Sequence, residues 1–301
     1  MNPQTLLNPN WYITGSSKGL GLSAVIILLK RGYNVAATTR DKQGLIKNVK
    51  KELENDSVTL GQLESRFLPL QVDLVNEKSV KESIDSTIAK FGSIDVIVNN
   101  AGYGLSGAVE ELSDKDIRKQ FDINFFGMVN VVRAALPHMR EYAKDTINHP
   151  LGARIFNIGS IGGFSAGISF SVYCSSKAAM DCLTEGLQIE LEQFKNIHVI
   201  SVMPGVFRTD FLGGSLEQTT KPISAYTDVR DNMHERLTQH HGHQQGDPNK
   251  AIEALIKVSQ YPSPPKRLFL GSDAYQRAQN KIKSLTAELE AWKEITLSTD
   301  Y

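Results

Sequence analysis

The sequence predicts an α/β protein with a mostly parallel, doubly wound sheet of seven strands, covered by helices on both faces. Three observations predict this fold. Strand-like runs alternate with helical runs along the chain, and the strand-like runs are apolar throughout, as expected for strands buried on both faces. The first strand also leads through a glycine-rich turn into an apolar helix. No linker or repeat divides the 301 residues, so we expect a single domain spanning 1–301.

The expected strands and helices follow each other as in successive strand–helix–strand units with right-handed crossovers. The strands are expected at 11–14, 34–38, 67–72, 94–99, 154–158, 198–203 and 267–270. The helices are expected near 20–31, 42–54, 77–91, 114–142, 172–194 and 249–260. Two polar insertions, 55–65 and 143–153, are expected at the surface.

Two further segments do not belong to this alternation. Residues 206–248 have no clear periodicity, and long irregular segments in compact domains are often functional, so we expect a substrate lid there. Residues 274–297 are expected to form a C-terminal helix. Its apolar residues stand at helical spacing, which favours packing on the domain or on a partner subunit; they are Ala278, Ile282, Leu285, Leu289 and Trp292.

A glycine-rich turn follows the first strand. Trp11-Tyr12-Ile13-Thr14 runs into Gly15-Ser16-Ser17-Lys18-Gly19-Leu20-Gly21 and then into an apolar helix. Glycines let the backbone approach a phosphate closely, and the helix N-terminus offers free N–H groups to the anion. A glycine triplet alone would indicate only a turn, but its place between a strand and a helix favours a dinucleotide site.

Tyr173 and Lys177 stand four residues apart in an expected helix and would therefore share one face. A free tyrosine has a pKa near ~10, and a neighbouring positive charge is expected to lower that pKa toward the working range of an acid–base catalyst. Ser160, thirteen positions before the tyrosine, could hold a substrate oxygen. The pair by itself is equally compatible with an ordinary amphipathic helix.

The order of these motifs along the chain resembles that of the short-chain dehydrogenase/reductase family, in its compact branch. The motifs are Thr14-Gly15 with Gly19 and Gly21, Asn99-Asn100-Ala101-Gly102, Ser160, Tyr173 with Lys177, and Pro204-Gly205. The resemblance covers nearly the whole chain and implies a Rossmann fold. Residues 246–248 and 270–274 are similar to a subgroup near the 17β-hydroxysteroid and retinol dehydrogenases.

The resemblance assigns four catalytic residues. Tyr173 would be the general acid and base, and Lys177 would both lower its pKa and hold the nicotinamide ribose. Ser160 would position the carbonyl oxygen, and Asn124 would join a water-linked proton relay to the lysine. A polar residue satisfied at a helix kink is the alternative for Asn124. Asp122 is expected to be exposed or capping and not a general base.

The expected cofactor-binding residues lie beyond the carboxyl ends of the strands, where such folds bind their ligands. They are Gly15, Ser17, Lys18, Gly19, Leu20, Gly21, Arg40, Asp73, Asn100, Ala101, Gly102, Tyr173, Lys177, Pro204, Gly205, Val206 and Thr209. By resemblance, Asp73 would hydrogen-bond the adenine, although its position also suits a helix N-cap.

The end of the second strand predicts NADP(H) in preference to NAD(H). An acidic residue there would accept hydrogen bonds from the ribose 2′-hydroxyl, but this chain has Thr38-Thr39-Arg40. Arg40 can hold a 2′-phosphate through two N–H donors, and Lys18 would add a second cation. Asp41 leaves NAD(H) open, because a small shift of the loop could present its carboxylate instead.

Aromatic and aliphatic residues on the loops around the catalytic residues predict an apolar substrate, a ketone, an aldehyde or a secondary alcohol. These residues are Tyr103, Phe164, Phe170, Phe207, Phe211 and Leu212. Two other functions remain open. One is a nucleotide-sugar epimerase or dehydratase, which usually has a Gly-x-x-Gly-x-x-Gly turn. The other is a non-catalytic NADP(H)-binding sensor on the same fold.

Composition limits the partners. Lys plus Arg and Asp plus Glu both number 33, which argues against nucleic acid and anionic membranes. Cys174 and Cys182 lack metal spacing and are expected to pack as small apolar residues in a reducing compartment. The His240-His241-Gly242-His243 run is expected to be a polar loop, so no metal is predicted. No signal peptide is visible, so we expect a cytoplasmic protein, and the resemblance implies a homodimer or homotetramer.

Overall fold

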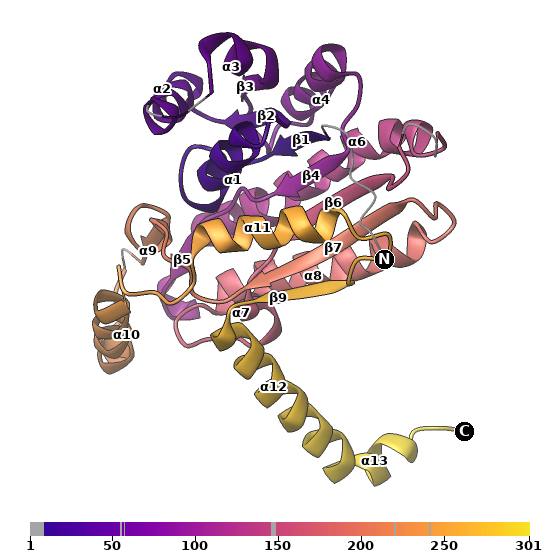
Figure 1. Cartoon of the computed structure of the whole chain (residues 1–301). Helices are drawn as coiled ribbons and strands as arrows, with labels where there is room; N and C mark the ends of the chain where they lie inside the picture. Colours follow the sequence, from indigo (N-terminus) through magenta and orange to yellow (C-terminus); the bar gives the residue numbers. More distant parts are fainter. Residues whose placement is uncertain (1–8, 55, 57, 146–148, 220, 241) are drawn as a thin grey trace.

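The computed structural model describes residues 9–54, 56, 58–145, 149–219, 221–240 and 242–301. Seven parallel strands form one sheet in the order β3-β2-β1-β4-β6-β7-β9 (Figure 1). The strands are β1 Asn10–Ile13, β2 Asn34–Thr39, β3 Phe67–Gln71, β4 Val96–Asn99, β6 Ala153–Ile158, β7 Ile197–Pro204 and β9 Arg267–Leu270. The order reverses between β1 and β4, as in a doubly wound sheet. The predicted fold is therefore confirmed.

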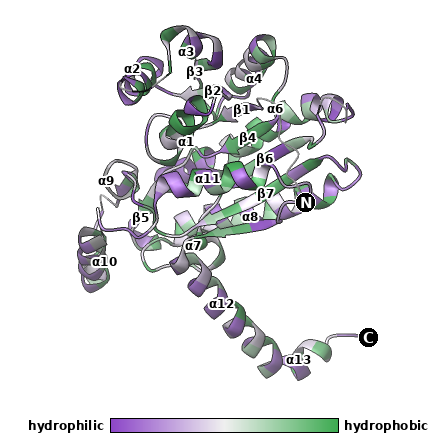
Figure 2. Ribbon diagram, viewed as in Figure 1, coloured by the Kyte–Doolittle hydropathy of each residue, from purple (hydrophilic) through white to green (hydrophobic). Residues whose placement is uncertain are grey.

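Helices cover both faces of the sheet and create two separate cores. The first face carries α1 Gly19–Lys30, α2 Lys42–Leu53 and α11 Pro248–Ser259. The second carries α4 Glu77–Phe91, α6 Gly127–Tyr142 and α8 Ser171–Glu190. Within β1, Trp11 and Ile13 join the first core and Tyr12 joins the second. The alternation explains why the strands are apolar at every position, and Figure 2 shows the hydrophobic strands between the helices.

One expected surface insertion contains a helix. Residues 55–65 were expected to be polar surface chain, but α3 spans Leu60–Arg66 and its Leu63 is buried in the first core. Thr59 and Gln62 form a capping box at its start. In the second insertion, Ala143 and Leu151 are buried, and residues 146–148 lie outside the described part. Both expectations were wrong in part, because single apolar residues in polar segments gave no periodic signal.

Residues 206–248, which we call the lid segment, are more regular than expected. They contain α9 Phe211–Gly214, β8 Leu216–Gln218, a short 3₁₀ turn and α10 Thr227–His240. β8 pairs in parallel with β5 Gly104–Ser106 in a separate two-stranded sheet. The sequence did carry a signal for α10, because Val229, Met233 and Leu237 recur at four-residue intervals. The stripe is narrow, and polar residues surround it.

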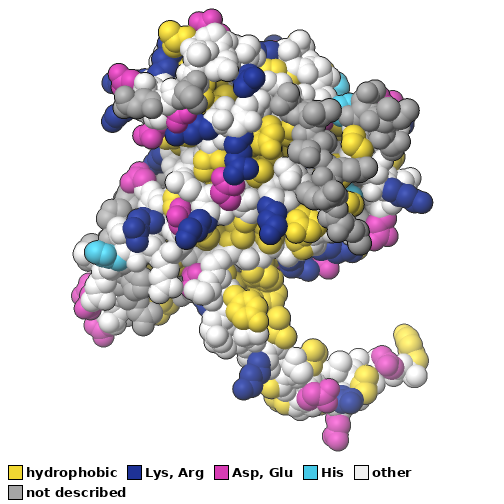
Figure 3. All heavy atoms as spheres, viewed as in Figure 1, with side chains coloured by type: hydrophobic (Ala, Val, Ile, Leu, Met, Phe, Trp, Pro, Cys, Tyr) yellow, Lys and Arg dark blue, Asp and Glu magenta, His cyan; other side chains and the backbone are white. Residues whose placement is uncertain are grey.

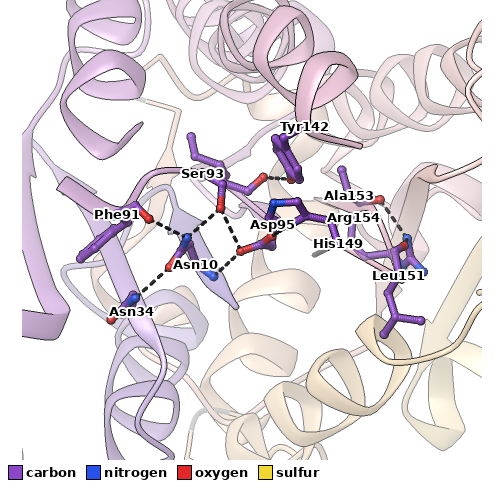
Figure 4. A network of polar contacts seen from close by, with 11 residues as sticks. Asn10, Asn34, Phe91, Ser93, Asp95, Tyr142, His149, Leu151, Ala153 and Arg154 are labelled. Carbon is purple, nitrogen blue, oxygen red and sulfur yellow. Dashed lines mark hydrogen bonds and ion pairs between the residues drawn. The ribbon is translucent and has the colours of Figure 1, made fainter. Parts of the chain in front are cut away.

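Buried polar side chains join the amino ends of the strands (Figure 4). The Asp95 carboxylate accepts a hydrogen bond from the Asn10 backbone N–H at 2.7 Å and lies 3.2 Å from His149 Nδ1. Asn10 also donates to the Ser93 hydroxyl at 2.8 Å. Burial raises the pKa of Asp95 despite these partners.

Arg154, fully buried, donates to the carbonyl of Tyr261 at 2.9 Å. These contacts lie opposite the carboxyl ends, so they hold strands together without taking part in a ligand site.

The chain ends in a helical arm. α12 Ser272–Ala291 packs at its beginning against β9 and α7 Ile161–Phe164, through Ala274 and Ala278. Beyond that contact, α12 and the short α13 Lys293–Leu297 extend away from the domain (Figure 1). In the part of the chain that the structure describes, no helix is long and apolar enough to cross a membrane.

Candidate functional site

A cleft of about 690 Å³ opens at the carboxyl ends of the strands, beneath the lid segment. Its walls come from the turn after β1 and from the residues that follow β2, β3, β4, β6 and β7. Most of the predicted cofactor-binding residues line it; they are Gly15, Ser17, Lys18, Gly19, Leu20, Arg40, Asp73, Asn100, Ala101, Gly102, Tyr173, Lys177, Pro204, Gly205, Val206 and Thr209. Gly21 does not line this cleft; it lies behind the turn, where α1 packs against the sheet. Segments far apart in sequence thus meet in one cleft.

Close packing requires glycine in the turn after β1. Gly15 has φ +66°, and a Cβ placed on it would lie 2.7 Å from the Cα of Ala101. A Cβ on Gly21 would lie 2.3 Å from the carbonyl oxygen of Gly15. Asn100 braces the turn by donating from Nδ2 to the carbonyls of Thr14 and Gly15, both at 3.0 Å. The turn therefore keeps a fixed shape with its backbone at the cleft surface.

The N-terminus of α1 faces the cleft without a capping side chain. Lys18 occupies the N-cap position and makes no side-chain cap, whereas α2 and α4 are capped by Asp41 and Asn76. The first N–H groups of α1 are left for an anion, and the positive end of the helix dipole favours one. The donors and the glycine surface fit the pyrophosphate of a dinucleotide.

The side chain of Lys18 is directed to the lid segment. Its Nζ donates to the carbonyl of Gly214 at 2.5 Å and lies 3.5 Å from the carboxylate of Asp210. Lys18 was expected to act as a second phosphate-binding cation beside Arg40. In this structure it instead links the glycine turn to the lid segment, and a phosphate contact would require that link to open.

The two charged residues after β2, Arg40 and Asp41, differ in their contacts. Arg40 is exposed at the cleft, and no carboxylate in the described part of the chain pairs with it. Asp41 caps α2, accepting from the N–H of Gly44 at 2.9 Å, and its own N–H donates to the Thr39 hydroxyl at 3.1 Å. The carboxylate that left NAD(H) open is thus already used by the helix.

Asp73 lines the cleft just beyond β3. Its carboxylate accepts from the N–H of Val75 at 3.1 Å, and its own N–H donates to the Ser79 hydroxyl at 3.1 Å. The alternative that Asp73 is a helix N-cap was wrong, because Asn76 caps α4. Four residues separate the end of β3 at Gln71 from the true cap, which the sequence spacing did not resolve.

Ser160, Tyr173 and Lys177 share one wall of the cleft. Ser160 follows β6 and caps α7, its hydroxyl accepting from the N–H of Gly162 at 3.0 Å. Tyr173 and Lys177 lie on the same face of α8, and the tyrosine ring packs edge-on to Phe170, 6.0 Å between ring centroids. The Ser160 hydroxyl is hydrogen-bonded to the Tyr173 side chain, which places the two hydroxyl groups side by side.

The pKa values of this pair differ from the expectation. Burial raises the pKa of Tyr173 to about 12, although the hydrogen bond from Ser160 lowers it in part. Burial also lowers the pKa of Lys177 to about 8. The predicted lowering of the tyrosine pKa by the lysine was wrong for the protein by itself. Desolvation is the main cause of both shifts, and the Lys177 ammonium donates a hydrogen bond to the carbonyl of Ile158 at 2.8 Å.

Asn124 lies fully buried in a π-helical segment, Asp122–Phe126, between α5 Asp114–Phe121 and α6. Its Oδ1 accepts from the N–H of Tyr103, and its Nδ2 donates to the carbonyl of Tyr103, both at 3.0 Å. A Cβ on Gly102 would be 3.1 Å from Asn124 Oδ1 and 3.4 Å from Lys177 Nζ. Asn124 is therefore both the satisfied polar residue at a helix irregularity and a neighbour of the lysine. π-Bulges often mark functional sites.

Four of the six expected apolar wall residues line the cleft; they are Tyr103, Phe170, Phe207 and Phe211. Phe164 does not, because it packs against Phe269 at 5.5 Å between ring centroids, beside α12. The side chain of Leu212 lies outside the described part. The sequence reasoning missed further wall residues, among them Lys119, Ile123, Glu217, Leu237 and Arg277. Only Ile123, beside Asn124, had a nearby motif that could have indicated it.

The lid segment is fastened to the domain by polar contacts. The Glu111 carboxylate is buried, accepts from the N–H of Ile223 at 2.9 Å and is hydrogen-bonded to Arg230 of α10. Lys119 of α5 pairs with Glu217 of β8 at 2.7 Å, at the rim of the cleft. These contacts hold Leu237 of α10 over the cavity.

The remaining sequence expectations concern cysteine and histidine. Cys174 is buried as expected, but Cys182 is exposed on α8, so its prediction as a packed residue was wrong. The helical face that it occupies is turned to solvent. His241 lies outside the described residues. Among the residues that are described, no three His, Cys, Asp or Glu side chains are grouped to hold a metal ion.

Residues 10–220 match the family model described as short chain dehydrogenase. An uncharacterized oxidoreductase of Schizosaccharomyces pombe is 33% identical over 287 residues, covering 95% of this chain and 89% of that protein. Retinol dehydrogenase 8 of Bos taurus is 34% identical over 223 residues, covering 72% of this chain and 64% of the bovine protein.

The solved structures agree with these sequence matches. A short-chain dehydrogenase from Streptomyces avermitilis is 30% identical, with a TM-score of 0.82, and covers 97% of this chain and 99% of that one. ElxO with NADP bound is 25% identical, with a TM-score of 0.71 over 90% of this chain and 100% of that one. A protein from Burkholderia phymatum in complex with NAD shares the fold at 17% identity, with a TM-score of 0.78 over 95% of this chain and 97% of that one.

Proposed function

Since the chain belongs to the short-chain dehydrogenase/reductase family, and is therefore an oxidoreductase by relationship, we propose that it is an NADP(H)-dependent carbonyl reductase or alcohol dehydrogenase. Its substrate is a hydrophobic ketone, aldehyde or secondary alcohol. The observation that carries the proposal is the convergence of Ser160, Tyr173 and Lys177 on one cleft wall, in the same cleft as the glycine turn after β1.

The cofactor site is assigned to residues that already have suitable shape and charge. The glycine turn and the uncapped N-terminus of α1 hold the pyrophosphate. Asp73 and Ala101 flank the adenosine end, and the residues after β7, Gly205 and Thr209, flank the nicotinamide end. The nicotinamide, when bound, gives a hydride to the substrate carbon or takes one from it.

The chain itself handles the proton. In reduction, the Tyr173 hydroxyl donates its proton to the substrate oxygen as that oxygen gains negative charge, while Ser160 holds the same oxygen by a hydrogen bond. In oxidation, Tyr173 takes the proton of the alcohol. Lys177, on the same cleft wall, holds the ribose hydroxyls, and Asn124 fixes the backbone beside the lysine.

A preference for NADP(H) follows from the charges at the end of β2. Arg40 is exposed at the cleft and carries two parallel N–H donors for a 2′-phosphate. Asp41, the residue that would favour a 2′-hydroxyl, is engaged in capping α2. Relatives of this fold are found with either cofactor, so the preference rests on these two side chains.

The cleft supports an apolar substrate. Aromatic rings of Phe170 and Phe211 pack around Tyr173, and Leu237 closes the cleft from α10. Charged residues stand at the rim, where Lys119 pairs with Glu217. This arrangement suits a molecule with an apolar body whose carbonyl reaches Ser160 and Tyr173. The retinol dehydrogenase among the relatives also carries an apolar substrate in its name.

Oxidation of NADPH with a panel of aryl ketones, long-chain aldehydes and sugars tests the proposal. We expect turnover with the apolar carbonyls and kcat/KM at least tenfold higher with NADPH than with NADH. Preference for a sugar would contradict the apolar substrate. Binding of NADPH without turnover of any carbonyl or alcohol would favour the sensor, and conversion of a nucleotide sugar would favour the epimerase.

A further inference from the structure

The C-terminal arm exposes a row of large apolar side chains. Ile282, Leu285, Leu289 and Trp292 are 53%, 39%, 68% and 63% exposed; the first three lie on α12, and Trp292 is its C-cap. Only the beginning of α12 is covered by its own domain, at Ala274 and Ala278. Figure 3 shows hydrophobic side chains along this arm, which stands free of the rest of the molecule. Large exposed apolar rows of this kind usually mark an interaction surface.

The spacing of the row is that of a helix-pairing seam. Counting from Tyr275, the row continues through Ala278, Ile282, Leu285, Leu289 and Trp292, in alternating steps of three and four residues. This is the a/d pattern of a coiled coil, in which the apolar seam packs against another helix. A helix that lies on a lipid surface needs no such regular 3–4 alternation, and usually has a strongly basic polar face.

The charges beside the seam identify the partner helix. Lys281 flanks the seam near the domain, and Glu288 flanks it about two turns further on. At 100° per residue, both lie on the same side of the seam, whereas Lys283 and Glu290 point away from it. This flank is therefore basic toward the domain and acidic toward the tip.

We propose that the arm pairs with the arm of a second copy of this chain in antiparallel orientation. A two-fold axis near Leu285 places Ile282 beside Leu289 of the partner subunit and covers both apolar rows. The same axis places the basic part of the flank opposite the acidic part of its partner, Lys281 against the partner's Glu288. A parallel pair would set like charges at equal heights instead.

Cysteine cross-linking tests the contact directly, whatever other interfaces the protein has. In a full-length Cys182→Ser background, Leu285→Cys is expected to form a disulfide-linked dimer on mild oxidation, since the two residues meet at the axis. Ser284→Cys is the matched control, on the opposite face of the same helix, and is expected to remain monomeric on a denaturing gel. No cross-link at 285, or equal cross-linking at 284, overturns the proposal.

Charge reversal tests the orientation. Lys281→Glu and Glu288→Lys are each expected to weaken self-association several-fold at low salt, because like charges then face each other at both symmetric contacts. The chain with both substitutions restores opposite charges in the antiparallel pair, and is expected to regain most of the affinity. Sedimentation velocity over a range of protein concentrations measures this. Failure of the double variant to recover overturns the antiparallel arrangement.

Two further measurements exclude the competing explanations. Leu289→Glu/Trp292→Glu is expected to lower the assembly by one step, dimer to monomer or tetramer to dimer, with unchanged hydrogen exchange in the seven-stranded sheet. Flotation with phosphatidylcholine/phosphatidylserine vesicles examines a lipid surface. The proposal is overturned in favour of a membrane contact if Leu289→Glu abolishes vesicle binding and the sedimentation of the unsubstituted chain does not depend on protein concentration.

Discussion

Arg230 on α10 is hydrogen-bonded to Glu111, whose carboxylate is completely buried where the lid segment meets the domain. The backbone N–H of Ile223 also donates to this carboxylate, and these contacts hold the pKa of Glu111 below its ordinary value. The ion pair joins the helix that covers the cleft to the loop after β5. Movement of α10 away from the cleft would therefore break this ion pair or carry the loop after β5 with it.

Arg230→Ala is expected to loosen the lid segment, because the Glu111 carboxylate would stay buried without its cation. We expect KM for the apolar substrate to rise several-fold while cofactor binding stays nearly unchanged. Hydrogen exchange in α10 should also become faster. Arg133→Ala, which removes an exposed arginine paired with Glu77, is the matched control. Equal exchange rates in both variants would show that the pair does not fasten the lid segment.

The same pair predicts a pH dependence. The pKa of Glu111 is lower in the folded protein than in the unfolded chain. The contribution of Glu111 to stability is therefore present above the unfolded pKa and is lost as the pH falls through the folded pKa. We expect α10 to lose exchange protection under acid conditions before the sheet does. A Glu111→Gln chain should lack this separate acid transition.

Tyr173→Phe is expected to remove turnover, with a loss of at least about a thousandfold in kcat, because no other hydroxyl in the described part of the cleft is bonded to Ser160. The Kd for NADPH should change less than threefold, since the phenol oxygen is assigned to the substrate side. Tyr103→Phe, whose ring also lines the cleft, is the control. Substantial activity in Tyr173→Phe would refute the assigned proton donor.

Lys177→Met is expected to stabilise the cofactor-free chain while destroying its activity. Burial lowers the pKa of Lys177 to about 8 from an ordinary value near 10.5. The unfolded chain then binds more protons between these values, so the free energy of unfolding rises with pH across that window. The rise amounts to about 1.4 kcal/mol per unit at most.

Urea unfolding at pH 7.5 and 9.5, below the range where Tyr173 titrates, measures this effect. The unsubstituted chain should gain stability relative to Lys177→Met as the pH rises. An equal change of unfolding free energy with pH in both chains would show that Lys177 is not desolvated in solution. Lys177→Met should also bind NADPH more weakly, which tests the proposed role of Lys177 at the ribose.

Arg40→Ala is expected to lower kcat/KM for NADPH by about 10- to 100-fold, the worth of a charge-assisted contact to a phosphate, and to leave NADH nearly unaffected. Lys42→Ala removes an exposed cation two residues away and serves as control. An equal loss with both cofactors would mean that Arg40 supports the loop and does not select the phosphate.

Local sequence patterns, together with the family resemblance, were sufficient for the seven-stranded sheet and for the positions of most expected cofactor-binding residues. Each strand of that sheet begins and ends within two residues of its expected boundaries, because apolar runs and glycine turns are local signals. Leu63 was missed for the opposite reason, because its burial depends on surfaces contributed by distant segments. α10 was missed because its apolar stripe is narrow and polar residues surround it.

The electrostatics could not be predicted from spacing. The sequence places Lys177 one turn after Tyr173, which suggests a lowered phenol pKa. The folded chain instead buries both groups and turns the ammonium toward Ile158. Similarly, Lys18 stands in the glycine turn, but its partner Asp210 is 192 positions away, as their residue numbers show. Long-range pairing and desolvation become visible only in three dimensions.

A change from the proposed NADP(H) preference to NAD(H) would have to spare Asp41. That aspartate already starts α2, and its replacement by a residue without a capping oxygen would cost about 1 kcal/mol. The nearest available carboxylate therefore cannot be recruited by moving the loop without damaging the helix behind it. A new acidic residue at Thr39, combined with loss of Arg40, is the shorter route. Selection for the other nicotinamide would be expected to leave its trace at those two codons.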